Sequence, residues 1–202
     1  MRKILIFILV LFISGCTVVR IDTSDIDTIV NVILSKKNDL YNQVGGGYKY
    51  YIPRGVTYID TDELNDKLYS NGSYYYLYVD VIGYTNNTLF AYEENPNAYY
   101  SRKISPEDGF KSSGYLEIEE QEDGLYYIKF LYNYAKIETV VEKENLNLAV
   151  LNSAYILSTI QFNTDVIGLM LDDDYFTNKE EKYEVFAKNE NSENNFGLTY
   201  ED

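Results

Sequence analysis

The chain has 202 residues, 32 acidic and 17 basic side chains, a net charge of −15, one cysteine, and neither histidine nor tryptophan. The missing histidine excludes Ser-His-Asp and Cys-His catalysis and imidazole metal ligands. The acidic charge disfavours nucleic-acid binding, which depends on Lys and Arg to neutralise phosphates. We therefore expect no nucleic-acid partner, and an enzyme would have to use carboxylates, Tyr, Lys or an oxygen-ligated metal.

The N-terminus has the order of features that is typical of an export signal. Arg2 and Lys3 precede ten consecutive apolar residues, Ile4 to Ile13, and small residues follow. A helix of that length rises about 15 Å, half of a hydrocarbon core of about 30 Å. The segment is therefore predicted to be a signal peptide rather than a membrane span.

The tetrapeptide Ile13-Ser14-Gly15-Cys16 resembles the bacterial lipobox, apart from Ile13 where that motif usually has Leu. The resemblance covers the first sixteen residues only. It implies a diacylglycerol on the Cys16 thiol, cleavage between Gly15 and Cys16, and further acylation, such as palmitate, at the new N-terminus. A lipoprotein of this class is held by its acyl chains in the cell membrane, on the extracytoplasmic face. The alternative is an ordinary secretory signal followed by an incidental cysteine.

Cleavage before Cys16 would leave 187 residues with 15 basic and 32 acidic side chains, a net charge of −17. An acylated lone thiol leaves no cysteine for disulfides, thiolate metal sites or catalysis. The length suits one domain. We predict a signal peptide at 1–15, a lipidated tether at 16–23, a single domain at 24–188 and an acidic, disordered tail at 189–202.

The first predicted element after the tether is an amphipathic helix. Its apolar residues recur at helical spacing, at Ile26, Ile29, Val30, Ile33 and Leu34. Ser24 is a candidate N-cap, and Lys36 and Lys37 would lie in the last turn, where positive charge suits the helix dipole.

The next segment is predicted to hold short elements joined by turns. Strands are expected at Tyr48 to Ile52 and at Val56 to Ile59, followed by a brief helix from Thr61 to Tyr69. Asn71-Gly72 is a strong turn signal before a run of tyrosines.

From Tyr74 to Ile82 the pattern has a period of two, which predicts a strand. Leu77, Val79 and Val81 would face the core, and the opposite face would carry a ladder of Tyr74, Tyr76 and Tyr78, with Asp80 after it. Such a ladder can recognise a glycan or a peptide through apolar area and hydroxyls. The alternative is that another element covers it.

A long irregular excursion with at most a short strand is expected from Asn86 to Ser113, and a hairpin follows it. The hairpin arms are Tyr115 to Glu119 and Leu125 to Val141, with a turn at Asp123-Gly124.

Glu117 and Glu119 would share one face of the first hairpin arm. Carboxylates two residues apart on a strand lie about 6.6 Å apart, within the range for an inverting glycosidase. Any solvated strand can carry two glutamates, so this signal is weak.

A second helix is predicted from Leu146 to Ile160, packed against the sheet. Val166 to Leu171 and Tyr183 to Ala187 are weaker elements.

Acidic clusters occur at Asp172-Asp173-Asp174 and at Asp60, Asp62 and Glu63. Oxygen ligands suit Ca²⁺, but neither cluster has the EF-hand spacing. Solvated loops are the favoured interpretation, and no metal or cofactor is expected.

These patterns predict an α+β protein. Its mainly antiparallel sheet would be packed by the N-terminal amphipathic helix and by a second helix near 146–160. No catalytic group is assembled in the sequence. The favoured interpretation is a membrane-anchored extracytoplasmic lipoprotein that binds an envelope protein or a cell-wall glycan or peptide without catalysis. The alternative is a carboxylate-dependent hydrolase of envelope polymers. A transporter's solute-binding component is a third, poorer fit, because alternating strand and helix units are missing.

Overall fold

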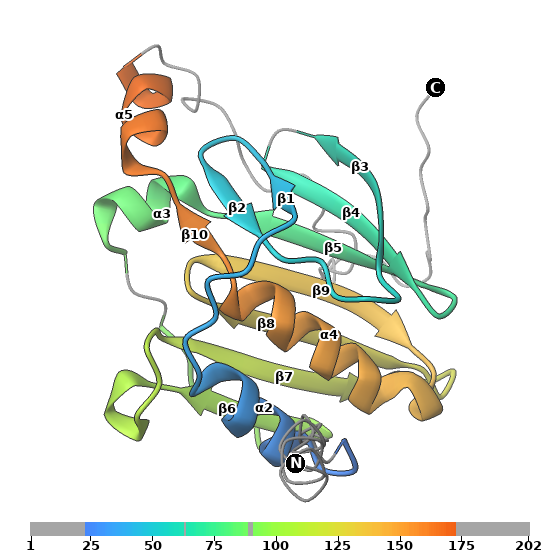
Figure 1. Cartoon of the computed structure of the whole chain (residues 1–202). Coiled ribbons are helices and arrows are strands. Elements are labelled where there is room, and N and C mark those ends of the chain that lie inside the picture. The colour runs from blue at the N-terminus through green and yellow to red at the C-terminus, as the bar shows by residue number, and fades with distance from the viewer. Residues whose placement is uncertain (1–22, 63, 89–90, 173–202) are drawn as a thin grey trace, which may run out of the picture.

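The computed structural model describes residues 23–62, 64–88 and 91–172 (Figure 1). The predicted lipidation site, the element at 183–187 and the tail at 189–202 lie outside these residues. The described part combines helices with a seven-stranded antiparallel sheet, which confirms the predicted α+β class. None of the helices in this part is long and apolar enough to cross a membrane.

The large sheet has the strand order β3-β4-β5-β9-β8-β7-β6, and every neighbouring pair is antiparallel. Its strands are β3 (Thr57–Asp62), β4 (Asn65–Ser70), β5 (Ser73–Val79), β6 (Tyr100–Ile104), β7 (Gly114–Glu120), β8 (Tyr126–Tyr132) and β9 (Ala135–Val141). Hairpins build most of the sheet, because β3 to β5 and β7 to β9 are consecutive in the chain.

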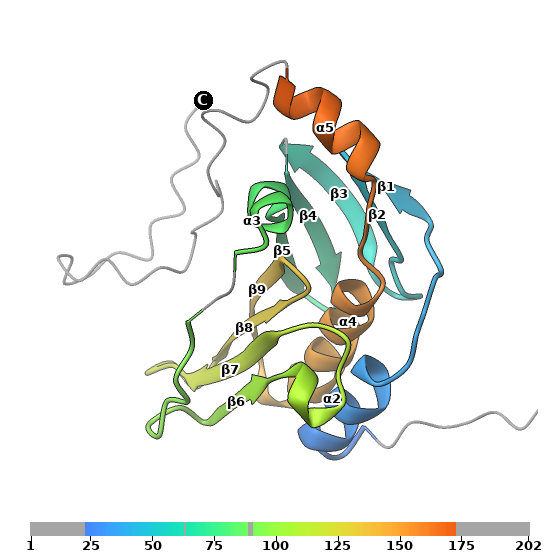
Figure 2. The same cartoon turned by 90° about the vertical axis from the view of Figure 1, so that its left-hand side faces the viewer.

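Two helices and a small sheet lie on one side of the large sheet (Figure 2). The helix α4 (Leu146–Ser158) packs on β8 and β9, and α2 (Ile26–Leu34) packs on α4. The small sheet has the order β1-β2-β10, formed by β1 (Gln43–Val44), β2 (Tyr48–Tyr50) and β10 (Gln161–Phe162). The remaining elements are α3 (Val81–Asn86), α5 (Thr164–Asp172) and the 3₁₀ turns η1 (Pro106–Asp108) and η2 (Lys143–Asn145).

The hydrophobic core lies between the large sheet and α4. The sheet contributes alternate residues such as Leu77, Ile128 and Ile137, each fully buried. The helix α4 lies between the sheet and α2, so apolar residues on most of its circumference are covered, as the sequence predicted. The second predicted helix is therefore confirmed, with its end at Ser158.

The ends of α2 differ from the prediction. Asp25, not Ser24, is the N-cap, and its Oδ2 accepts a 2.8 Å hydrogen bond from the Thr28 N–H. The helix ends at Leu34 with Ser35 as C-cap, so Lys36 and Lys37 lie beyond its last turn. The acidic cap suits the positive end of the helix dipole.

The helix predicted from Thr61 to Tyr69 is wrong, because β3 and β4 occupy this segment. Asp66 lies on the core side of β4 and is 1% exposed, so the apolar alternation that marks a strand is broken. The Asn71-Gly72 turn is confirmed, with φ of 47° and 85° and Ser70 paired to Ser73. Such a two-residue turn joins two strands, so the turn signal itself favoured a strand before Asn71.

Two predicted strands have different ends from those expected. The strand from Tyr74 ends at Val79, because Asp80 caps α3 and accepts a 2.7 Å hydrogen bond from the Gly83 N–H; Val81 is buried in that helix. The arm predicted from Leu125 to Val141 is two strands, β8 and β9.

The turn between β8 and β9 has Asn133 and Tyr134 at φ of 53° and 57°. Asparagine is common in this conformation, but tyrosine is not, so Asn133-Tyr134 lacks the full signature of a hairpin turn such as Asn-Gly.

Candidate functional site

The face of the large sheet that points away from α2 and α4, here called the outer face, is the candidate site (Figure 2). Side chains alternate along β5, so Tyr75, Leu77 and Val79 join the core. Tyr74, Tyr76 and Tyr78 therefore point to the outer face, on the side expected from the sequence pattern. Their exposure differs, because Tyr74 is 42% exposed, Tyr76 is 8% exposed and Tyr78 is half-buried.

A row of cross-strand neighbours runs over the outer face from one edge of the sheet to the other. The row consists of Asp60, Lys67, Tyr76, Glu138, Lys129, Glu117 and Ser101, in strand order. Acidic and basic side chains alternate along it, and opposite charges in cross-strand pairs stabilise a sheet. The middle of the outer face is therefore charged and polar, in contrast to the apolar core on the other side.

A buried ion pair lies at the centre of this face. Nζ of Lys136 is 3.0 Å from Oε1 of Glu138, and the side chains are 10% and 4% exposed. Lys129 is more distant, with its Nζ 4.0 Å from the same oxygen. Burial raises the pKa of the Tyr127 hydroxyl, and the adjacent Glu138 carboxylate raises it further, so this phenol keeps its proton.

An aromatic cluster, exposed at Tyr69 and Tyr74 and buried at Tyr76, lies on β4 and β5 of the outer face. We call Lys67, Tyr69, Tyr74 and Tyr76 the tyrosine patch. The ring centroids of Tyr69 and Tyr74 are 5.2 Å apart, and those of Tyr74 and Tyr76 are 6.4 Å apart. Lys67 Nζ lies 4.3 Å from the Tyr74 ring centroid, in cation–π geometry.

Two members of the patch, Lys67 and Tyr69, were missed by sequence reasoning. Both lie on β4, in the segment predicted to be helical, and on a helix they would not share a face with the tyrosines of β5. The Asn71-Gly72 signal would have found them, because a two-residue hairpin pairs Tyr69 with Tyr74 across the turn.

The two glutamates of the hydrolase alternative lie on the outer face of β7, and one of them is engaged by a loop. The Tyr92 hydroxyl donates a 2.6 Å hydrogen bond to Oε2 of Glu117, and its ring stacks on Tyr115 with centroids 4.0 Å apart. Burial raises the pKa of Tyr92, and its hydrogen bond to Glu117 adds to the shift. Glu119 lies opposite Tyr127 on β8. Glu117 therefore has a structural partner within the protein.

The acidic residues that the sequence singled out form no metal site in the described part of the chain. No group of three or more His, Cys, Asp or Glu that could hold an ion occurs among residues 23–62, 64–88 and 91–172. Asp60 and Asp62 on β3 lie opposite Lys67 and Asn65 of β4. Glu63, Asp173 and Asp174 lie outside the described residues.

A hollow of about 260 Å³ lies on another part of the molecule, beside the β8–β9 turn. Its polar side chains bond one another: Ser112 Oγ donates to Asn133 Oδ1 at 3.0 Å, and the Tyr134 hydroxyl donates to Asn87 Oδ1 at 2.8 Å. These contacts hold the turn in place, so the polar side chains named here already have partners within the protein.

The outer face thus offers apolar area, hydroxyls and lysine side chains for binding. Glu117, Lys136 and Glu138 on this face are engaged in hydrogen bonds or an ion pair that support the sheet. Comparisons of the chain with protein-family models, with curated proteins and with solved structures found no match.

Proposed function

We propose that this chain is an extracytoplasmic lipoprotein, anchored in the cell membrane by acyl chains on Cys16, whose domain binds an envelope protein through the tyrosine patch without catalysis. The lipobox resemblance supports the anchor. The exposure of Tyr69 and Tyr74, 38% and 42%, on the outer face supports the binding role. Neighbouring exposed tyrosines are frequent at protein interfaces, because each supplies rigid apolar area and a hydroxyl.

The orientation of the rings favours a protein partner over a glycan. The Tyr69 and Tyr74 rings are inclined by 59°, so they form no flat platform for a sugar ring. Lys67 also occupies one face of Tyr74. The exposed parts of the two inclined rings suit the irregular surface of a protein better than a flat sugar ring.

The test removes the two exposed rings and compares the binding of that variant with the binding of a variant that lacks an exposed tyrosine elsewhere. A photoreactive amino acid at position 69 should crosslink an envelope protein in cells. The purified partner should then bind Tyr69→Ala/Tyr74→Ala at least tenfold more weakly, because tyrosine hot spots contribute about 2 kcal/mol or more. Tyr41→Ala is a matched control, since Tyr41 is 53% exposed and carries Lys49 Nζ 3.9 Å from its ring centroid.

Equal affinity of the double variant and the Tyr41→Ala control would disprove the patch assignment. Loss of binding to purified cell-wall glycan in the double variant, with its affinity for the crosslinked protein unchanged, would replace the protein partner by a glycan. Circular dichroism and urea unfolding of each variant establish that the domain is folded.

A further inference from the structure

A second hollow, of about 760 Å³, lies where the chain enters the domain. It is lined by the first residues of α2, by Tyr99 and Tyr100 at the start of β6, and by η2 with the beginning of α4. Nδ2 of Asn147 donates a 2.7 Å hydrogen bond to the Thr23 carbonyl, which ties the entering chain to α4. The position at which the predicted tether meets the domain is therefore defined.

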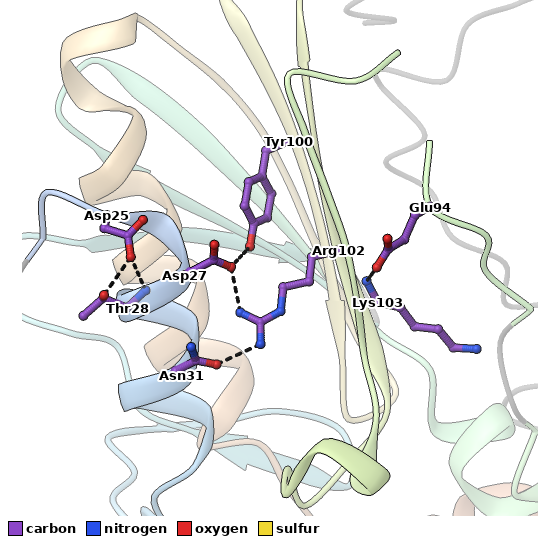
Figure 3. Close-up of polar contacts among 8 residues, drawn as sticks. All are labelled: Asp25, Asp27, Thr28, Asn31, Glu94, Tyr100, Arg102 and Lys103. Carbon is purple, nitrogen blue, oxygen red and sulfur yellow. Dashed lines mark hydrogen bonds and ion pairs between the residues drawn. The ribbon is translucent and has the colours of Figure 1, made fainter. Parts of the chain in front are cut away.

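On one side of the hollow, a network of hydrogen bonds connects α2 to β6 (Figure 3). The Tyr100 hydroxyl donates a 2.6 Å hydrogen bond to Oδ1 of Asp27, and Arg102 bonds the same oxygen at 2.9 Å. Arg102 also donates to Oδ1 of Asn31 at 2.8 Å. This network links the first two turns of α2 to the edge of the large sheet, so the hollow belongs to the folded framework.

Two exposed apolar side chains line this hollow. Tyr99 is 48% exposed and Leu148 is 38% exposed. The Tyr99 ring packs edge-on against Tyr126, with centroids 4.9 Å apart, which leaves the other side of Tyr99 open. Tyrosine is enriched at the headgroup level of a membrane, where its ring is apolar and its hydroxyl polar.

The length of the tether restricts where this surface can lie. Six residues separate Cys16 from Thr23, and a fully extended chain of that length spans about 25 Å at most. An anchored Cys16 therefore keeps the hollow close to the bilayer. Figures 1 and 2 both show α5, which carries the exposed Leu169, at the opposite end of the molecule from α2.

The charge of the protein determines what kind of contact is available there. Asp25, Asp27 and Glu144 line the hollow against a single lysine, Lys143, so the surface has no basic patch to attract anionic lipids. Contact with the membrane must come from apolar burial at the interface. A neutral, zwitterionic bilayer suits this surface better than an anionic one.

We propose that the end of the domain formed by Thr23–Asp27, Tyr99 and Leu148 lies against the bilayer surface, with Tyr99 and Leu148 in the headgroup layer. This proposal rests on the Cys16 anchor of the proposed function, but it is independent of the tyrosine patch. The domain would then have a fixed orientation on the bilayer, with α5 pointing away from the membrane.

The test uses the absence of tryptophan from the chain. The predicted mature chain, Cys16 to Asp202, is coupled through the Cys16 thiol to a maleimide lipid in phosphatidylcholine vesicles that contain a headgroup spin label. Leu148→Trp and, as a matched control on α5, Leu169→Trp each provide one tryptophan at an exposed leucine. We expect the spin label to quench Leu148→Trp at least threefold more strongly than Leu169→Trp.

Chemical coupling supplies the anchor, so the result does not depend on whether cells acylate Cys16 and does not involve the tyrosine patch. Adding Tyr99→Asp to the Leu148→Trp chain should reduce the quenching, because a carboxylate disfavours the interface. Equal quenching at positions 148 and 169 in folded chains would overturn the proposal, and so would quenching at position 148 that Tyr99→Asp leaves unchanged.

Discussion

The Tyr50 hydroxyl donates a 2.7 Å hydrogen bond to Oδ2 of Asp66 and thereby joins the small sheet to the core side of β4. Tyr48 donates to the same oxygen at 3.2 Å. Asp66 is 1% exposed, and burial raises its pKa, while hydrogen bonds from Thr61, Tyr50 and Tyr48 partly oppose the shift. A buried carboxylate surrounded by hydroxyls therefore connects the two sheets.

Removing the shorter of these hydrogen bonds should destabilise the protein measurably. Tyr50→Phe leaves the buried Asp66 with one donor fewer, so we expect the free energy of unfolding to fall by about 1.5–3 kcal/mol. Tyr48→Phe should cost less, because its bond is longer. Urea unfolding measures both. Equal losses in the two variants would contradict the assigned difference in hydrogen-bond strength.

Asp66 should also make stability depend on pH in a defined direction. Its pKa in the folded state is raised, so the folded protein holds this proton more tightly than the unfolded chain, in which an aspartate titrates near about 3.9. The stability from this group is complete below that value and is lost as pH rises through the folded pKa. Wild type should therefore gain stability relative to Asp66→Asn when the pH is lowered from 7 to 4. If the difference in unfolding free energy between wild type and Asp66→Asn does not change with pH, the raised pKa of Asp66 is disproved.

The sequence predicted those elements whose apolar spacing is regular. The α+β class, α4 and the paired faces of β5 and β7 all follow from periodicity, because their core residues alternate or recur without interruption. Asp66 interrupts the alternation of apolar residues on β4, so this strand was not predicted. The turn between β8 and β9 was missed because Tyr134, at a positive φ after Asn133, stands where a hairpin turn usually has glycine.

The candidate site was only partly accessible to sequence reasoning. The ladder of Tyr74, Tyr76 and Tyr78 was predicted from alternation, but not the difference in exposure among its members. That difference comes from the neighbouring strands, β4 and β9, whose side chains lie beside Tyr76. The contact between Tyr92 and Glu117 joins residues 25 positions apart, for which the sequence holds no local signal.

The buried pair of Lys136 and Glu138 should be sensitive to removal of one partner. Glu138→Ala leaves a lysine side chain that is 10% exposed without its carboxylate, and we expect a loss of about 3–5 kcal/mol in unfolding free energy. Lys129→Met is the control, since that side chain is 36% exposed and its contact is 4.0 Å, so at most about 1 kcal/mol is expected.

The double replacement Lys136→Met/Glu138→Leu should recover most of the stability, because an apolar pair of similar volume needs no charge compensation. If the double variant is as unstable as Glu138→Ala, the two charges do not act as a pair.

Arg102 should hold α2 against the edge of the large sheet through the shape of its side chain. One guanidinium bonds both Asp27 and Asn31, which lie one turn apart on α2. Arg102→Lys keeps the charge, but one ammonium cannot span both acceptors with the same geometry. The side chains of Arg102 and Asp27 are 24% and 56% exposed, so screening by water limits the expected loss to about 1 kcal/mol.

Hydrogen exchange of the α2 amides provides the sharper measurement, because a local loosening of α2 changes their protection before the whole domain unfolds. Protection should fall in Arg102→Ala and in Arg102→Lys alike. Lys103→Ala is the matched control: Lys103 points to the outer face, and its bond to Glu94 Oε1 uses the backbone N–H at 3.0 Å, which the substitution retains. Wild-type protection in Arg102→Lys would show that charge alone holds the helix. An equal loss of protection in Lys103→Ala would show that β6 as a whole, rather than the Arg102 guanidinium, determines how α2 and the entry point of the tether are positioned.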